Sequence, residues 1–192
     1  NLLKTNGADN DGFAVSLNYD NGPILLLANF SRLSDSDNSF IWSLGGQYRF
    51  GPFKTSLGYE QTRDNGWKPH ATGSSYANKY EGVRSRQDNY ILSGEYATGP
   101  HKVAAAFNYM KIRDIRRESG SSDDSLFLGN YDSGDARKYS IGYFYSLSKR
   151  TTLYGQLAYT DFEDKTLARF FRGETFSGDS VTGISLGINH LF

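Results

Sequence analysis

The sequence contains no cysteine, four prolines and one methionine among its 192 residues. Without cysteine it can form neither a disulfide framework nor a cysteine-ligated metal site. No stretch approaches the roughly 18 to 20 consecutive apolar residues that a membrane helix needs, so helical membrane spans are excluded. Basic and acidic residues are equal in number, at 21 each, and this balance gives no sign of electrostatic capture of nucleic acid. Residues 1–5 lack the basic and apolar regions of a signal peptide, so we expect either its removal or a missing N-terminus.

Aromatic residues are abundant, with 14 tyrosines and 13 phenylalanines, which is too many for a disordered chain of this polarity. Good helix formers never gather into a long window with a period of 3.6 residues. The composition therefore predicts an ordered, all-β chain.

Apolar residues alternate with small or polar residues in segment after segment, which is the period of a β-strand. Between residues 39 and 50, for example, Trp42 and Leu44 fall on one face, and Ser43 and Gly45 fall on the other. The pattern predicts nine strands, at about 12–20, 24–32, 39–50, 53–62, 88–97, 101–112, 137–147, 151–160 and 180–192.

The connections between these strands alternate between short and long. The short ones are Asn21-Gly22-Pro23, Gly51-Pro52, Thr98-Gly99-Pro100 and Ser148-Lys149-Arg150, and three of them have the chemistry of tight turns. The long ones are predicted as loops at 33–38, 63–87, 113–136 and 161–179. Transmembrane barrels of outer membranes have short turns at one end and longer loops at the other.

Tyrosine and phenylalanine recur near the ends of the apolar faces, where an aromatic girdle meets lipid headgroups. The predicted lipid-facing girdle comprises Tyr19, Tyr48, Phe50, Phe53, Tyr59, Tyr96, Tyr109, Tyr145 and Tyr159. A soluble β-sandwich also alternates, but it would bury this tyrosine-rich face in protein. The fold class we predict is all-β, a transmembrane antiparallel β-barrel.

The strand count is odd, whereas complete single-chain bacterial barrels have even numbers of strands. We therefore expect N-terminal strands to be absent from this sequence, or one strand within residues 1–11 to have escaped the pattern. The structure should be an open, curved, antiparallel sheet of about nine strands with unpaired edges.

Three runs resemble a known family, the general porins of Gram-negative bacteria and particularly the trimeric porins of beta-proteobacteria. Residues 187–192, Gly-Ile-Asn-His-Leu-Phe, look like the family's closing strand, Gly-Leu-Arg-His-x-Phe. Residues 143–151 are similar to its penultimate turn, which carries a Leu-Ser-Lys-Arg-Thr run, and the Asn-Gly-Pro and Thr-Gly-Pro turns look like its periplasmic hairpins. Asn189 stands where the family usually has arginine, so ion preference should not be copied across.

The resemblance implies that residues 1–192 form the C-terminal part of a single barrel domain of sixteen strands, in the bacterial outer membrane with a periplasmic C-terminus. It implies a non-enzymatic channel for passive diffusion of ions and small hydrophilic solutes, without a cofactor. The implied partners are the lipid bilayer, lipopolysaccharide, two further copies in a homotrimer, and the barrel-assembly machinery, which reads the closing strand through Phe192.

Polar residues on the second face of the strands are the candidates for the channel wall. The predicted pore-lining residues are Asn18, Asn29, Gln47, Arg49, Lys54, Glu60, Glu95, Asn108, Lys138, Gln156 and Asn189. Charges of both signs on such a wall set a field that tunes ion passage. The alternative is that some of them only pair with one another or with missing strands.

Metal and catalytic sites have little support. The three histidines, His70, His101 and His190, are too far apart in sequence for a short-spacing metal motif. Ser185 and His190 differ by an odd number and should face opposite sides of a strand, which argues against a nucleophile and base pair. The acidic residues of 121–125, with Asp132 and Asp135, lack the spacing of a calcium loop and are interpreted as solvated. Loop arginines at positions 113, 116 and 117 could attract lipopolysaccharide phosphates, although such residues are more often simply solvated.

Two other functions remain open at this point. A substrate-specific channel or barrel enzyme should carry a cluster of aromatic or catalytic residues on one face, and no such cluster is visible. A structural or adhesive barrel would have a plugged lumen.

Overall fold

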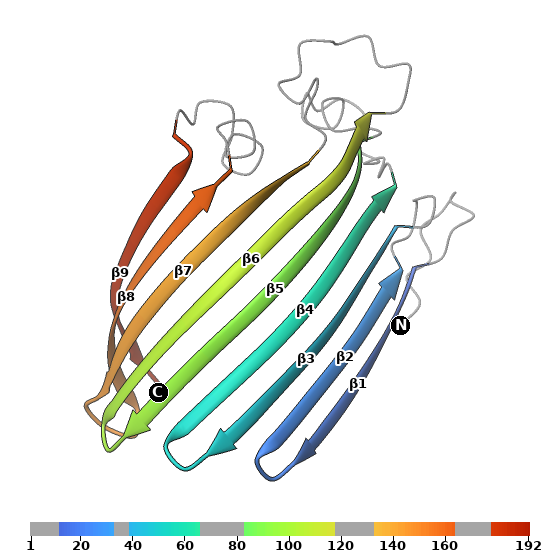
Figure 1. Cartoon of the computed structure of the whole chain (residues 1–192). Helices are drawn as coiled ribbons and strands as arrows, with labels where there is room; N and C mark the ends of the chain where they lie inside the picture. The colour runs from blue at the N-terminus through green and yellow to red at the C-terminus, as the bar shows by residue number, and fades with distance from the viewer. Residues whose placement is uncertain (1–11, 33–38, 66–82, 118–132, 164–177) are drawn as a thin grey trace.

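A computed structural model describes residues 12–32, 39–65, 83–117, 133–163 and 178–192, and these form one curved antiparallel sheet of nine strands (Figure 1). The strands are β1 (Phe13–Asn21), β2 (Ile24–Arg32), β3 (Phe40–Phe50), β4 (Phe53–Asn65), β5 (Val83–Thr98), β6 (His101–Arg117), β7 (Ser133–Ser146), β8 (Thr151–Phe162) and β9 (Ser180–His190). Within the described ranges, no helix is long and apolar enough to cross a membrane. The predicted all-β fold with nine antiparallel strands is confirmed.

Among the described strands, each one pairs only with its neighbours in the sequence, so the order in the sheet is β1 to β9 without a crossover. In the described part of the chain, β1 and β9 each have a single partner strand, and the sheet is open. The open, curved sheet expected from the sequence is therefore what the structure contains (Figure 1).

Tight turns gather at one end of the sheet, the lower end in Figure 1, which we call the turn end. Gly22, Gly51 and Gly99 have φ values of 59°, 56° and 54°, and each is followed by proline. A positive φ at the first of two loop residues is the feature of a type II′ hairpin turn, which matches the twist of the strands. The C-terminus lies at the same end, because Leu191 N donates to Arg150 O at 2.9 Å beside the fourth turn.

The strands extend further from the turn end than the alternation predicts. The ranges 63–65, 83–87, 113–117, 133–136 and 161–162 belong to strands, not to loops. Arg63 pairs with Arg86, and Arg86 pairs with Arg113, so the ladder continues where both faces have become polar and the hydrophobic period is lost. The loop positions predicted for the arginines at 113, 116 and 117 are wrong, since all three lie in β6.

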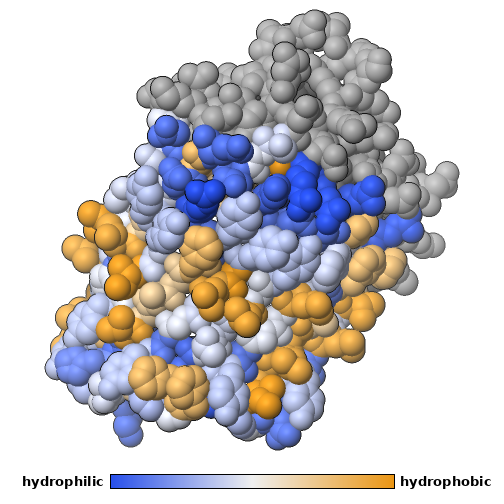
Figure 2. Space-filling view, viewed as in Figure 1, coloured by the Kyte–Doolittle hydropathy of each residue, from blue (hydrophilic) through white to orange (hydrophobic). Residues whose placement is uncertain are grey.

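The sheet has very little core. In the described residues, the buried hydrophobic side chains are Ile112, Ala136 and Phe162. By contrast, Leu17 is 68% exposed and Leu186 is 80% exposed. Figure 2 shows apolar side chains at the surface over much of the sheet and hydrophilic ones gathered toward the end opposite the turns. This single layer with an exposed apolar face contradicts the soluble sandwich, which would bury that face.

Candidate functional site

The strand register sorts the side chains of the sheet onto two faces, because residues opposite each other across a ladder point the same way. One cross-strand row, representative of what we call the apolar face, consists of Leu26, Gly46, Leu57, Leu92, Phe107, Tyr139, Tyr159 and Thr182. A row of the other face, the polar face, consists of Asp20, Leu25, Gln47, Ser56, Ser93, Ala106, Ser140, Ala158 and Gly183. Leu25 and Leu27 are the aliphatic residues that interrupt the polar face in β2, as the weak alternation there indicates.

All eleven residues predicted from the sequence to line a pore lie on the polar face, as the register of the eight ladders shows. All nine residues predicted for the lipid-facing girdle lie on the apolar face. Contact with water or lipid itself stays a prediction.

The polar face is concave. It encloses a hollow of about 420 Å³ that receives side chains from six successive strands, β3 to β8. Six of the predicted pore-lining residues border this one hollow, namely Gln47, Lys54, Glu95, Asn108, Lys138 and Gln156. Small residues such as Ser56, Ser93 and Ala106 form its floor and leave the space open. The fold thus brings residues that are about 100 positions apart in sequence to one polar cavity.

A cluster of charges lies at the border of this hollow near the turn end. Glu95 Oε2 is 3.0 Å from Lys54 Nζ and 3.8 Å from Lys102 Nζ. The Lys102 ammonium also lies 4.5 Å from the centre of the Phe144 ring, a cation–π distance. The sequence prediction did not include Lys102 and Phe144 among the pore-lining residues. Both are an even number of positions from predicted residues on their own strands, Asn108 and Lys138, and this spacing is the signal that could have identified them.

Several polar-face residues bind one another. Asn29 Nδ2 donates to Ser43 Oγ at 3.1 Å, and Asn89 Nδ2 donates to Glu60 Oε1 at 3.3 Å. The side-chain oxygen of Gln47, when it faces Arg49, accepts from Nε at 3.0 Å and from Nη2 at 3.1 Å. In the part of the chain that the structure describes, the other five predicted residues make no side-chain hydrogen bond or ion pair: Asn18, Asn108, Lys138, Gln156 and Asn189. Mutual pairing thus involves only part of the polar face.

Aromatic rings form two rows on the apolar face. Near the turn end, Phe50 and Phe53 have ring centroids 5.4 Å apart, and Phe53 and Tyr96 are 4.9 Å apart. Toward the opposite end, Tyr59 lies 5.0 Å from Trp42 and 5.0 Å from Tyr90. Trp42 and Tyr90 were missed as girdle residues, although their alternation is in phase with the rest of the apolar face.

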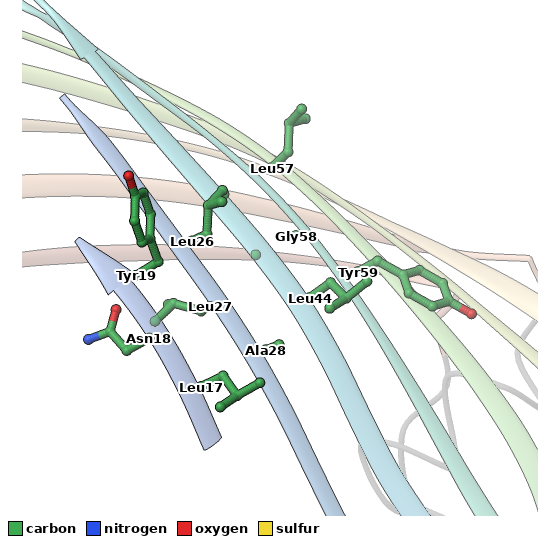
Figure 3. A pocket seen from close by; sticks show the side chains of 12 residues that line it. Leu17, Asn18, Tyr19, Leu26, Leu27, Ala28, Leu44, Leu57, Gly58 and Tyr59 are labelled. Atoms are coloured by element: carbon green, nitrogen blue, oxygen red, sulfur yellow. The ribbon is translucent and has the colours of Figure 1, made fainter. Parts of the chain in front are cut away.

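The apolar face also has hollows between its side chains. Figure 3 shows one of about 640 Å³ between β1 and β4, where Leu17, Leu26, Leu44 and Leu57 project from four neighbouring strands. Gly46 adds no side chain between them. Aliphatic residues dominate this hollow, which therefore lacks the converging polar groups of a binding site for a hydrophilic ligand.

Neither histidine of the described strands is placed for catalysis or metal binding. His101 Nδ1 lies 2.6 Å from Tyr143 Oη, and His190 Nδ1 lies 2.9 Å from Thr151 Oγ1. His190 is on the apolar face and Ser185 is on the polar face, as their odd spacing predicts. Among the described residues, no three histidine, aspartate or glutamate side chains gather as metal ligands. His70, Asp132 and residues 121–125 lie outside the described ranges.

Comparison with known proteins adds a family to this geometry. The family model described as Gram-negative porin matches residues 2–165. Outer membrane porin protein 32 of Delftia acidovorans is 27% identical over an alignment of 169 residues, covering 76% of this chain and 44% of that protein. An outer membrane porin protein of Bordetella pertussis is 26% identical over an alignment of 206 residues, covering 96% of this chain and 47% of the relative.

A solved structure has the same fold. The anion-selective porin from Comamonas acidovorans superposes with a TM-score of 0.66 at 23% sequence identity, covering 97% of this chain and 51% of that one. The chain spans about half the length of the curated relatives it matches. The nine-stranded sheet is therefore a substantial part of a porin-type barrel fold.

Proposed function

Because the chain belongs to the family of Gram-negative porins, a family of channels, we propose that its polar face is part of the wall of a water-filled channel in the bacterial outer membrane. Ions and small hydrophilic solutes diffuse passively along this wall. The channel needs no cofactor and no covalent chemistry, since the solute is never activated but only allowed to pass.

The observation that carries this proposal is the contrast between the two faces of one sheet. A lipid-facing strand surface must be apolar with aromatic borders, and a water-filled lumen needs small and polar side chains. The hollow of the polar face has the composition of a water-filled lumen, with Lys54, Glu95 and Lys138 among the residues around it. The apolar face, which carries both aromatic rows, has the composition of a lipid-facing surface.

We propose that residues 1–192 are the C-terminal part of a single barrel domain of sixteen strands. The open sheet and the half-length coverage of the relatives both support this, because lipid offers no hydrogen bonds to an unpaired strand edge. In this arrangement the tight turns and the C-terminus face the periplasm, and the opposite end faces the exterior.

The partners proposed from the family follow the same orientation. Three copies assemble as a homotrimer, lipopolysaccharide surrounds the exterior end, and the barrel-assembly machinery binds the closing strand. The side chain of Phe192 is fully exposed next to the last paired residues of β9, and this exposure supports its proposed role as a recognition site for another protein.

The first test is the conductance of the purified full-length protein in planar bilayers, with salts of different ion sizes. Stepwise insertions in threes, with conductance proportional to bulk salt conductivity, are expected for a trimeric water-filled pore. A silent bilayer despite verified barrel folding would overturn the proposal in favour of a plugged barrel.

A sharper test uses two neighbouring residues of β7, because the chain has no native cysteine. By the strand register, Ser140 is on the polar face opposite Ala106, whereas Ile141 is on the apolar face opposite Ala105 and is 52% exposed. A charged, membrane-impermeant thiol reagent should modify Ser140→Cys in the bilayer and lower its conductance, and should leave Ile141→Cys unmodified. Equal modification of both variants, or of Ile141→Cys alone, would contradict the assignment of the two faces.

A further inference from the structure

Two exposed aliphatic side chains interrupt the polar face in the middle of the sheet. Leu27 of β2 and Ile91 of β5 both point to this face, by the register of the ladders, and are 41% and 45% exposed. Leu27 thus projects on the opposite side of β2 from its neighbour Leu26 (Figure 3). Between Leu27 and Ile91, the same cross-strand row contains Gly45 of β3 and Gly58 of β4. We call these four residues, Leu27, Gly45, Gly58 and Ile91, the apolar slot.

The two glycines form an open floor between the aliphatic side chains. A Cβ atom added at Gly45 would lie 3.9 Å from Leu27 Cβ, and one added at Gly58 would lie 3.7 Å from Ile91 Cβ. The other described atoms within 4 Å of these positions are backbone oxygens, so no further described side chain covers the floor. Three strand spacings separate β2 from β5, which is about 14 Å along the sheet. This leaves room for a single ring or alkyl chain between the two side chains.

The position of the apolar slot determines what kind of molecule can fill it. Replacing the water around an exposed aliphatic side chain by another apolar group is favourable. On the apolar face that group is lipid, but the slot lies on the face that carries the polar hollow, which lipid does not reach in the proposed channel. A molecule that comes to the slot from the lumen is a solute. The slot therefore favours solutes that have an apolar part.

The next two residues of the row after Ile91 are hydrogen-bond donors. They are Asn108 of β6 and Lys138 of β7, which both border the polar hollow. Neither makes a side-chain hydrogen bond or ion pair within the described part of the chain. About 10 Å separates the backbones of β5 and β7, and the four-carbon stem of Lys138 spans much of this distance. An ammonium and an amide group together suit a carboxylate, which accepts charge-assisted hydrogen bonds.

One acidic side chain lies near the floor of the apolar slot and orients the solute. Glu60 is two residues beyond Gly58 on β4 and therefore shares its face. Its Oε1 accepts a hydrogen bond from Asn89, and its negative charge repels an acid group of the solute. The acid group is therefore directed across Ile91 toward Lys138, while the apolar part stays over the floor.

We propose that the apolar slot is a binding subsite of the channel for arylalkyl carboxylates, which carry a ring and an acid group several ångströms apart. The ring lies over the two glycines, between Leu27 and Ile91, and the carboxylate accepts hydrogen bonds from Lys138 and Asn108. The inference rests on the proposed function, since it requires the polar face to be open to solutes from the water. The slot is open toward the lumen, so the solute binds and leaves again, as passage requires.

The first test is block of the conductance of the full-length protein in planar bilayers by 4-phenylbutyrate. Butyrate, which has the acid group without the ring, should block much less at the same concentration, pH and ionic strength. Ile91→Ser should raise the half-blocking concentration of phenylbutyrate about fivefold, the loss expected when the contact buries about one methylene group. Val181→Ser removes an aliphatic side chain from the same row on β9 and should leave the block unchanged. Equal block by the two acids, or no effect of Ile91→Ser, would overturn the subsite.

The contact to the acid group is tested with a second pair of variants. Lys138→Gln should raise the half-blocking concentration of phenylbutyrate several-fold and leave that of 4-phenylbutanol, which has no charge, unchanged. Lys102→Gln removes the same charge from the polar face near the turn end and should alter the block by phenylbutyrate much less. Equal effects of Lys138→Gln and Lys102→Gln would mean that the block reflects the general field of the lumen, and would contradict a carboxylate contact at Lys138.

A cysteine on the floor of the apolar slot reports binding without a current. Gly45→Cys fits there, because its Cβ makes ordinary contacts, and Gly183→Cys is its control at an open glycine on the polar face of β9. In the folded full-length protein in detergent, phenylbutyrate should slow the reaction of Gly45→Cys with a charged thiol reagent several-fold and leave Gly183→Cys unaffected. An unreactive Gly45→Cys would mean that another part of the protein covers the slot, and would overturn the inference.

The two kinds of measurement separate this inference from the proposed function. Normal conductance in salt, without block or protection by phenylbutyrate, would overturn the subsite and leave the channel standing. Protection of Gly45→Cys in a folded protein that does not conduct would overturn the channel and leave a binding site for arylalkyl carboxylates.

Discussion

Glu95 is the residue on which the local field of the polar hollow depends. Among the described residues, it is the single carboxylate within ion-pair distance of both Lys54 and Lys102. Neutralising it by Glu95→Gln should leave two uncompensated ammonium groups and raise anion over cation permeability about two- to fivefold, on the order of 1 kcal/mol for a charge a few ångströms away in water. Reversal potentials in a salt gradient measure this ratio.

The opposite change provides the control. Lys102→Gln leaves one lysine with Glu95 and should shift the reversal potential toward cations. Both shifts should shrink at high salt, because exposed charges are screened. Shifts of the same sign in the two variants would contradict a purely electrostatic role of this cluster.

Asp88 has a different role because its side chain is buried. Asp88→Ala removes the carboxylate oxygen that accepts hydrogen bonds from Tyr59 and Gln61, and leaves two neighbouring guanidinium groups without their shared anion. We expect a loss of about 2 kcal/mol in the free energy of unfolding, in the range found for hydrogen bonds to charged groups. Denaturant-induced unfolding in detergent measures it, and Asp161→Ala, a substitution at a less buried position of β8, should cost much less. Equal stability of the two variants would be the contrary result.

At the scale of elements, the two-residue turns depend on glycine at their first position. Gly51→Ala forces a side chain into the left-handed region at φ 56° and should cost about 1 kcal/mol. Gly94→Ala is the matched control, because Gly94 is in extended backbone with open space around it and should tolerate the change. The comparison of the two melting temperatures checks the prediction, and equal melting temperatures would argue against a turn that requires positive φ.

The elements also show where sequence reasoning succeeds and where it ends. Near the turn end, proline and glycine delimit the hairpins, and the predicted boundaries of β2, β3 and β4 agree with the structure within one residue there. At the opposite end, Arg86 and Arg113 belong to strands whose backbone pairing continues beyond the apolar band. Backbone hydrogen bonds do not require a hydrophobic period, so the pattern loses its signal before the strand ends.

For the candidate site, the sequence predicts which face of the sheet each residue lies on, because side chains alternate along a strand. Period two places Lys54, Glu95 and Lys138 on one face because the register shift in the β5–β6 ladder lies at Arg84 and Arg86, away from these positions. Which of them meet across the sheet depends on curvature and register, and the sequence encodes neither directly. The residues around Asp88 could not be predicted from alternation, because a charged residue on the apolar face breaks the pattern and is interpreted as the end of the strand.

At the scale of the whole molecule, the two open edges of the sheet lead us to expect that the edge strands are less stable than the central strands. If the full-length barrel pairs both edges, amides in β1 and β9 should exchange with solvent as slowly as those in β5 and β6. In the isolated chain of 192 residues, β1 and β9 should exchange faster, because each has one neighbour in the described sheet. Hydrogen exchange of both forms in detergent measures this, and equal protection in the isolated chain would mean that its edges pair with each other.

The strictly sequential strand order has a mechanical consequence. In the described sheet of the isolated chain, pulling on the C-terminus loads the ladder between β9 and β8 first, and no other described strand lies across that path. Each ladder then bears the force only after its outer neighbour has been removed. The strands should therefore detach one after another under tension. This should give a series of discrete force peaks that proceeds from the C-terminus toward the N-terminus.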